Sequence, residues 1–140
     1  MYRVVLDTSV IVAALRSSKG ASHVLMRLVA ESKLLPLATS ALFLEYEDVL
    51  KRPEQRLAHN LSLEQIDGFL SALASACKPV DVHFRWRPML ADPADEMVLE
   101  AAFNGRADAL VTHNVKDFAR AADFFALRVL RPGEFLKEIA

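Results

Sequence analysis

Short apolar runs along the chain are the first sign of its architecture. Four of them have the length and composition of buried strands, at residues 3–6, 35–38, 109–112 and 126–130. Residues 79–82 resemble a fifth strand, nearer an edge of the sheet. Because these runs are mostly apolar and do not alternate with polar residues, they predict a parallel sheet covered on both faces.

Helical patterns fill the gaps between the predicted strands. Residues 22–32 carry an apolar face, and a second helix is expected over residues 40–51, capped by Ser40. Residues 62–65 form a capping box, and the helix they open keeps one apolar face as far as Cys77. The polar segment of residues 51–61 is expected to be a turn or loop.

Two further helices are predicted in the second half. One starts at residues 92–93, where a proline suits the first helical position, and is expected to end at Phe103. Residues 104–105 read Asn-Gly, which is typical of a left-handed stop. A short helix follows residues 132–133.

Strands that alternate with helices predict an α/β fold around a mainly parallel sheet of four to five strands. The 140 residues match one domain and show no repeat or linker, so we expect a single domain over residues 1–140. No apolar run approaches the ~18 residues of a membrane span. The first residues lack the features of a signal peptide, so a soluble, cytoplasmic protein is expected.

Composition excludes some sites and leaves another open. The single cysteine rules out an internal disulfide and a cysteine-cluster zinc site, and the four scattered histidines argue against a histidine zinc site. The net charge of −1 is less basic than is usual for a nucleic-acid binder. If five of the 18 acids form one buried site, however, the rest of the chain has 13 acids and 17 Lys and Arg, and so a net charge of +4. The five acids in question are Asp7, Glu45, Asp92, Asp95 and Asp117.

Four of these acids are predicted to meet at one edge of the sheet. Asp7 follows the first predicted strand and Asp117 follows the third, and ligand sites in parallel sheets lie beyond the carboxyl ends of the strands. Asp95 lies in the first turn of its helix and Glu45 in the second turn of another. Both helices are expected to begin at that same edge.

Each acid also has an ordinary structural explanation. Asp7 or Asp117 could cap a turn or helix, Asp95 could favour a helix dipole, and Glu45 could be solvated. For Asp92, we favour the role of a helix cap. Together, however, clustered carboxylates repel one another, and a hard divalent cation such as Mg²⁺ or Mn²⁺ removes that cost. Such a metal can activate water for phosphodiester hydrolysis.

The order and spacing of four motifs resemble the PIN domain family of ribonucleases, in particular the VapC-like toxins of bacterial and archaeal toxin–antitoxin pairs. The resemblance covers essentially the whole chain. The motifs that carry it are Val5-Leu6-Asp7-Thr8-Ser9-Val10, Leu44-Glu45-Tyr46, Asp92-Pro93-Ala94-Asp95-Glu96 with Leu99-Glu100-Ala101-Ala102 behind it, and Thr112-His113-Asn114-Val115-Lys116-Asp117-Phe118.

The resemblance implies a three-layer α/β/α sandwich that cuts single-stranded RNA with Mg²⁺ or Mn²⁺. The family's acidic quartet maps onto Asp7, Glu45, Asp95 and Asp117. Asp92 matches a subgroup and is kept as an outer-shell ligand of the metal. The supporting polar positions are Ser9, Thr112 and Asn114. The resemblance also implies a cognate antitoxin protein as partner, and the apolar helix faces leave room for a homodimer.

Several residues near the acidic motifs are candidates for RNA contacts. They are Arg16, Lys51, Arg52, Arg85, Trp86 and Arg87. The cations could hold phosphates and Trp86 could stack on a base. Alternatively, Trp86 packs at the sheet edge and the arginines are solvated. Lys116 is expected to be solvated, His113 to be structural, and Cys77 to lie inert in the core face of its helix.

Rival enzyme classes fit the sequence poorly. A haloacid-dehalogenase-type phosphatase needs a second acid at the position of Ser9, and a dinucleotide-binding domain needs a glycine-rich first turn. A receiver domain needs an aspartate after a middle strand, where this chain has Thr39 and Ser40. The serious alternative is a non-catalytic module of the same fold that binds RNA or a protein.

Overall fold

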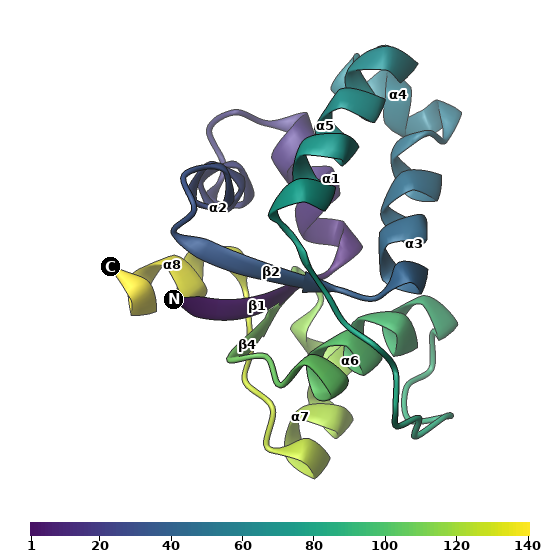
Figure 1. Cartoon of the computed structure of the whole chain (residues 1–140), viewed down its shortest axis with the longest axis vertical. Coiled ribbons are helices and arrows are strands. Elements are labelled where there is room, and N and C mark those ends of the chain that lie inside the picture. Colours follow the sequence, from purple (N-terminus) through teal and green to yellow (C-terminus); the bar gives the residue numbers. More distant parts are fainter.

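The computed structural model describes residues 1–140 and contains one parallel, five-stranded sheet with the strand order β3-β2-β1-β4-β5 (Figure 1). The strands are β1 (Tyr2–Leu6), β2 (Leu34–Ala38), β3 (Lys78–Pro79), β4 (Ala109–Val111) and β5 (Val129–Leu130). The predicted parallel α/β sheet is therefore confirmed. The strand predicted at residues 126–130 is shorter than expected, and the edge strand lies at the start of the predicted segment 79–82.

Helices cover both faces of the sheet. They are α1 (Thr8–Arg16), α2 (Ala21–Ala30), α3 (Ser40–Leu50), α4 (Pro53–His59), α5 (Leu63–Ala76), α6 (Pro93–Gly105), α7 (Ala119–Phe125) and α8 (Pro132–Ile139), with a 3₁₀ helix η1 (Val115–Phe118) before α7. Figure 1 shows α1, α2 and α5 on one side of the sheet and α6 and α7 on the other. The result is the expected three-layer sandwich. No helix is long and apolar enough to cross a membrane.

The central strands explain why the apolar runs do not alternate. Val4, Val5 and Leu6 of β1 are all buried, as are Leu110 and Val111 of β4. A strand between two neighbours in a sheet with helices on both faces has no solvent-facing side, so each position favours an apolar residue. These strands form the middle of one hydrophobic core of 24 buried residues.

Three helices were not predicted from the sequence: α1, α4 and α7, the last of which lies directly before the predicted strand 126–130. The helix α1 begins immediately after Asp7, where only a turn or a cap was considered. The segment 51–61, expected to be a turn or loop, contains α4. Pro53 occupies the start of α4 and Asn60, with φ 57°, ends it in the left-handed conformation. Because this short helix lies on the surface and Leu57 is 85% exposed, it lacks the apolar stripe that reveals longer helices.

Helix caps differ by one position from two of the predictions. Thr39, not Ser40, caps α3, and its side chain accepts the backbone N–H of Leu42. The left-handed residue after α6 is Arg106, with φ 52°, so the Asn-Gly stop predicted at residues 104–105 is wrong and both residues are helical. The capping box at the start of α5 is confirmed, with reciprocal bonds between Ser62 and Gln65.

Candidate active site

The pairing of β1 with β4 sets the centre of the site. Leu6 lies opposite Val111, so Asp7 and Thr112 are the first residues beyond two neighbouring strands. The backbone N–H of Asp7 donates to the carbonyl oxygen of Val111 at 2.9 Å. The Oδ2 atom of Asp7 accepts hydrogen bonds from the hydroxyls of Ser9 and Thr112, each at 2.7 Å. The structure therefore brings both predicted supporting hydroxyls against Asp7.

One carboxylate oxygen of Asp7 is left without a partner. Both hydroxyls bond Oδ2, and the side chain makes no capping bond to α1. Asp7 as a whole is only 5% exposed. Every fully buried side-chain oxygen in the chain has a hydrogen-bond partner, and because Oδ1 of Asp7 has none, Oδ1 reaches the surface. The carboxylate is thus fixed in place with one oxygen open to a ligand, an arrangement that a helix cap would not need.

A second layer of hydrogen bonds holds these hydroxyls. Ser9 Oγ accepts the backbone N–H of His113 at 3.2 Å, and Thr112 Oγ1 accepts that of Asn114 at 2.9 Å. The His113 ring lies 3.0 Å from the hydroxyl of the buried Ser22. This contact fits the expected structural role of His113. The Asn114 side chain itself makes no hydrogen bond within the chain.

Tyr46 positions the helix that carries Glu45. The Tyr46 hydroxyl is buried and donates to the carbonyl oxygen of Leu6, the last residue of β1. This bond ties α3 to the carboxyl end of the central strand.

Burial raises the pKa of Glu45, the Arg52 guanidinium opposes that rise, and the charges of Asp48, Asp92 and Asp7 add to it.

Asp95 is the most perturbed acid of the site. Burial and the charges of Asp7, Asp92, Asp117 and Glu96 raise its pKa from the ordinary 3.8 to about 7. Burial contributes most, and Asp7 is the strongest of the four charges. A carboxylate feels other carboxylates in this way only when they lie close by.

The two remaining acids are placed differently. Asp92 caps α6, because its Oδ1 accepts the backbone N–H of Ala94 at 2.9 Å, as expected for a helix cap. Its charge still acts on Glu45 and Asp95. Asp117 lies exposed in η1, directly beyond β4.

The oxygen atoms of the site are of the kind that binds a hard divalent cation, but as they stand they lie too far apart to hold one. Carboxylate and hydroxyl oxygens gather here, and the carboxylates have no buried cation among them, which favours Mg²⁺ or Mn²⁺. No three acidic, histidine or cysteine side chains are close enough together to hold a metal ion as they stand. Mutual repulsion spreads like charges, and a bound cation would allow them to approach.

The predicted RNA-contact residues all have partners within the chain. The guanidinium of Arg87 makes two hydrogen bonds, 2.9 and 2.6 Å, to Glu100, which is 6% exposed. Trp86 is 47% exposed and packs against the rings of Phe103 and Phe125. The partners of the others are Gln55 for Arg16, Glu47 and Asp67 for Lys51, Asp48 for Arg52, and Glu100 for Arg85. RNA binding by these residues stays a prediction.

One polar stripe on α6 was missed by sequence analysis. Glu96 Oε1 accepts the backbone N–H groups of Met89 and Leu90, at 2.7 and 2.8 Å. Glu100 holds Arg87, and Asn104 Oδ1 accepts the N–H groups of His83 and Phe84, both at 2.9 Å. The three helix residues are four apart and so share one face. That spacing of polar residues along one face is the sequence signal that could have revealed a loop lying along the helix.

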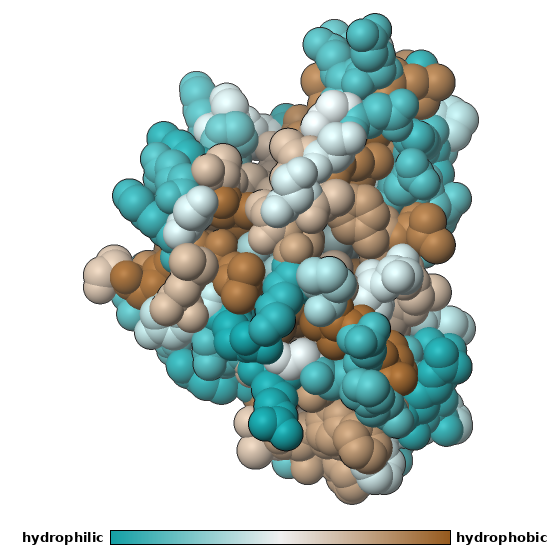
Figure 2. Space-filling view, viewed as in Figure 1, coloured by the Kyte–Doolittle hydropathy of each residue, from teal (hydrophilic) through white to brown (hydrophobic).

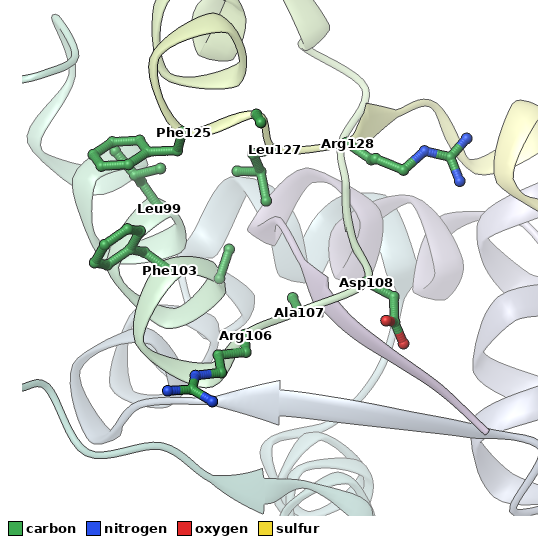
Figure 3. Close-up of a pocket in the computed structure, with 10 residues that line it drawn as sticks. Leu99, Phe103, Arg106, Ala107, Asp108, Phe125, Leu127 and Arg128 are labelled. Atoms are coloured by element: carbon green, nitrogen blue, oxygen red, sulfur yellow. The ribbon is translucent and has the colours of Figure 1, made fainter.

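A separate pocket lies away from the acids. It has a volume of about 170 Å³ and is lined by residues of α6, the segment before β4 and the end of α7 (Figure 3). Asp108 and Arg128 line it and precede β4 and β5, so they lie at the opposite edge of the sheet from Asp7. Figure 3 shows Phe103, Phe125 and Leu127 lining its apolar part. Cys77 lies partly buried at the end of α5, and burial raises the pKa of its thiol to about 11, which fits an inert group.

Comparisons with known proteins agree with this arrangement. A family model described as "PIN domain" matches residues 3–116. The structure is similar to the crystal structure of VapBC2 from Rickettsia felis bound to a DNA fragment from their promoter, with a TM-score of 0.62. That similarity covers 92% of this chain and 98% of the other, at 18% sequence identity, and so shows a shared fold. No curated protein matches the sequence.

Proposed function

This chain belongs to the PIN domain family, and we propose that it is a metal-dependent endoribonuclease that cleaves single-stranded RNA. The observation that carries the proposal is the environment of Asp95. Its pKa of about 7 reflects burial together with Asp7, Asp92 and Asp117, acids far apart in the sequence. Packing several carboxylates this closely is costly for the fold, and such perturbed groups are typical of functional sites.

The proposed ligands of the metal are Asp7, Glu45, Asp95 and Asp117, with Asp92 in an outer shell. Mg²⁺ or Mn²⁺ bound there would supply an activated water and stabilise the oxygen that leaves the phosphorus atom. Ser9 and Thr112 orient Asp7 so that Oδ1 is the oxygen available for binding. The Tyr46 hydroxyl ties the helix that carries Glu45 to the end of β1, and the cap at Asp92 sets the start of the helix that carries Asp95.

The biological role proposed is that of the toxin in a toxin–antitoxin pair. The support for this role is the family resemblance of the motifs around Asp7, Glu45, Asp95 and Asp117. A cognate antitoxin that covers the acidic edge of the sheet would restrain cleavage. Homodimer formation is proposed on the same basis.

A second function is supported by the spacing of the acids. Because no three of these side chains stand close enough to hold a metal ion, a non-catalytic module that uses this edge to bind RNA or a protein is the alternative. The two proposals differ in one respect that can be measured. Only the enzyme requires metal-dependent cleavage that is lost when Asp7 is neutralised.

The test uses the purified chain and a labelled single-stranded RNA, incubated with Mg²⁺, with Mn²⁺ and with EDTA. We expect cleavage with either metal, none in EDTA, and a loss of at least about 100-fold in the Asp7→Asn variant. The control is Asp108→Asn, which neutralises an aspartate at the opposite edge of the sheet and keeps an oxygen for the N–H of Arg3. An intact, folded protein that cleaves no RNA with either metal would favour the binding module.

A further inference from the structure

An open groove adjoins the acidic edge beside Asp117. It has a volume of about 400 Å³ and is formed by residues 88–91 on one side and by η1 and the start of α7 on the other. Three charged side chains line it, Lys116, Asp117 and Arg120. The groove is therefore lined by a proposed metal ligand and by two cations.

Those two cations have no partner within the chain. Neither Lys116 nor Arg120 makes an ion pair or a side-chain hydrogen bond, and both are exposed. Lysines and arginines elsewhere near the site, such as Lys51 and Arg87, are held by carboxylates. Asp123, the only acid of α7, forms no ion pair with Arg120. Lys116 and Arg120 are therefore free to contact an anion.

Exposed aromatic rings continue the same surface. Phe124 is 65% exposed, Phe84 59% and Trp86 47%. They rest on Phe103 and Phe125, with ring centroids 4.9 to 6.1 Å apart. Figure 2 shows a brown area at the lower end of the molecule, where Figure 1 places α7. These ring pairs are T-shaped, and the three outer rings stay exposed to solvent.

The cations and the rings are linked by α7. Arg120 and Phe124 are four residues apart and share one face of the helix, about 6 Å apart along its axis. The polar stripe of α6, made of Glu96, Glu100 and Asn104, holds the loop that carries Pro88 and Trp86 against α6. One continuous surface thus runs from Asp117 past two cations to a group of exposed rings.

We propose that this surface, made by η1, α7 and residues 84–91, binds the single RNA strand next to the cleaved bond. Lys116 and Arg120 contact its phosphates, and Phe124 and Trp86 stack on its bases. The inference rests on the proposed function, since it names the path of that enzyme's substrate. Positive charge along a backbone path combined with aromatic rings is the usual chemistry of single-strand binding. A purely apolar protein interface would not need two unpaired cations beside an acidic site.

Binding is tested in EDTA, so that it does not depend on cleavage. Fluorescence anisotropy measures the affinity for a labelled single-stranded RNA of about ten nucleotides over a range of salt concentrations. The variant Lys116→Ala/Arg120→Ala is compared with Arg27→Ala/Lys137→Ala. The control pair removes the same charge from exposed cations of α2 and α8, which also lack ion pairs. We expect the slope of log affinity against log salt to fall by about 1.4 in the first variant, for two lost phosphate contacts. The control should keep the wild-type slope.

The aromatic part is tested with substitutions at Phe124. Phe124→Leu should weaken RNA binding about tenfold, the size of one lost stacking contact, while Phe124→Tyr should retain it. A leucine keeps apolar bulk but has no ring face. If Phe124→Leu binds RNA as wild type does, the proposal is overturned. If, in addition, a Phe124→Asp variant changes the size of the protein in gel filtration, the aromatic surface is a protein interface.

Failure of this proposal differs from failure of the proposed function. Equal salt slopes for the two double variants, in a protein that cleaves RNA with Mn²⁺, would overturn the binding path alone. RNA binding that depends on Lys116, Arg120 and Phe124, in a protein that cleaves nothing, would support the path and contradict the nuclease.

Discussion

At the scale of single residues, the site depends on Asp95 and on the hydroxyls that hold Asp7. An acid with a pKa near 7 is a source of instability in a folded protein at neutral pH, because the unfolded chain ionises it freely. The fold retains this cost at a position where a bound cation would remove it. Asp7, by contrast, is stabilised by Ser9 and Thr112 on one oxygen only.

The first prediction concerns Asp95→Asn in EDTA. Folding raises the pKa of Asp95, so the protonated carboxyl favours the folded state. This contribution to the free energy of unfolding is fully present below the ordinary pKa of 3.8 and is lost as the pH rises through about 7. We expect the variant to be more stable than wild type at pH 8 by about 1–2 kcal/mol, after allowance for solvent screening. The difference should shrink steadily between pH 7 and pH 4. Urea unfolding across this range measures it, and a difference that grows toward low pH would contradict the assignment.

The second prediction concerns Thr112→Val. The change keeps the shape of the side chain but removes the donor to Asp7 and the acceptor for the N–H of Asn114. Because Thr112 is fully buried, we expect a loss of about 1–3 kcal/mol in the free energy of unfolding. Thr8→Val is the matched control, since Thr8 lies beside Asp7 and its hydroxyl makes no hydrogen bond. Similar losses for both variants would show that the hydroxyl of Thr112 has no special role.

At the scale of elements, the helix α6 does two things at once. Its first turn carries Asp95, and its polar stripe fixes the loop beside the site. The buried carboxylate of Glu96 accepts two backbone N–H groups, so it anchors the loop next to residues 92–95. Loss of this anchor should therefore affect the loop before it affects the rest of the fold.

The third prediction is that Glu96→Ala frees that loop. The backbone N–H groups of Met89 and Leu90 lose their acceptor and should exchange with solvent at least about tenfold faster. Hydrogen exchange measured by mass spectrometry of peptides covering the loop reads this directly. Glu64→Ala, in the first turn of α5, serves as the control because Glu64 is exposed and bonds nothing. Unchanged protection of the loop would mean that other contacts hold it.

The elements also show what sequence patterns can and cannot predict. The strands and the α5 helix were predictable because buried apolar runs and a capping box are local signals. The α4 helix was not, since Leu57 points to solvent and no apolar stripe marks it. The placement of Asp7 and Asp117 beyond the same ends of two strands was expected from the apolar runs, whereas the contact of Arg87 with Glu100 depends on a loop folding back on α6. Long-range side-chain pairs of that kind leave no periodic pattern.

At the scale of the whole molecule, the parallel sheet is what assembles the site. Parallel strands point their carboxyl ends the same way, so Asp7 and Asp117 follow two neighbouring strands at the same end of the sheet although they are 110 positions apart in the sequence. Helices that start at that edge add Glu45 and Asp95. Stability and ligand binding are therefore coupled, because any cation that binds the acids binds only the folded chain.

The fourth prediction is that Mg²⁺ or Mn²⁺ stabilises the protein. At about 100 times the dissociation constant, binding should add about 2.7 kcal/mol to the free energy of unfolding. Thermal unfolding in EDTA and in metal measures the gain. Asp7→Asn should lose most of it and Asp108→Asn should keep it. Equal stabilisation of both variants would place the metal elsewhere.

We propose above that the acids around Asp95 form the site of metal-dependent RNA cleavage. The most direct measurement is the rate at which wild type, Asp95→Asn and Asp108→Asn cleave one labelled single-stranded RNA at increasing Mn²⁺ concentrations. We expect Asp108→Asn to cleave like wild type and Asp95→Asn to be slower by at least about 100-fold at every concentration. Cleavage by Asp95→Asn at the wild-type rate would contradict the proposal.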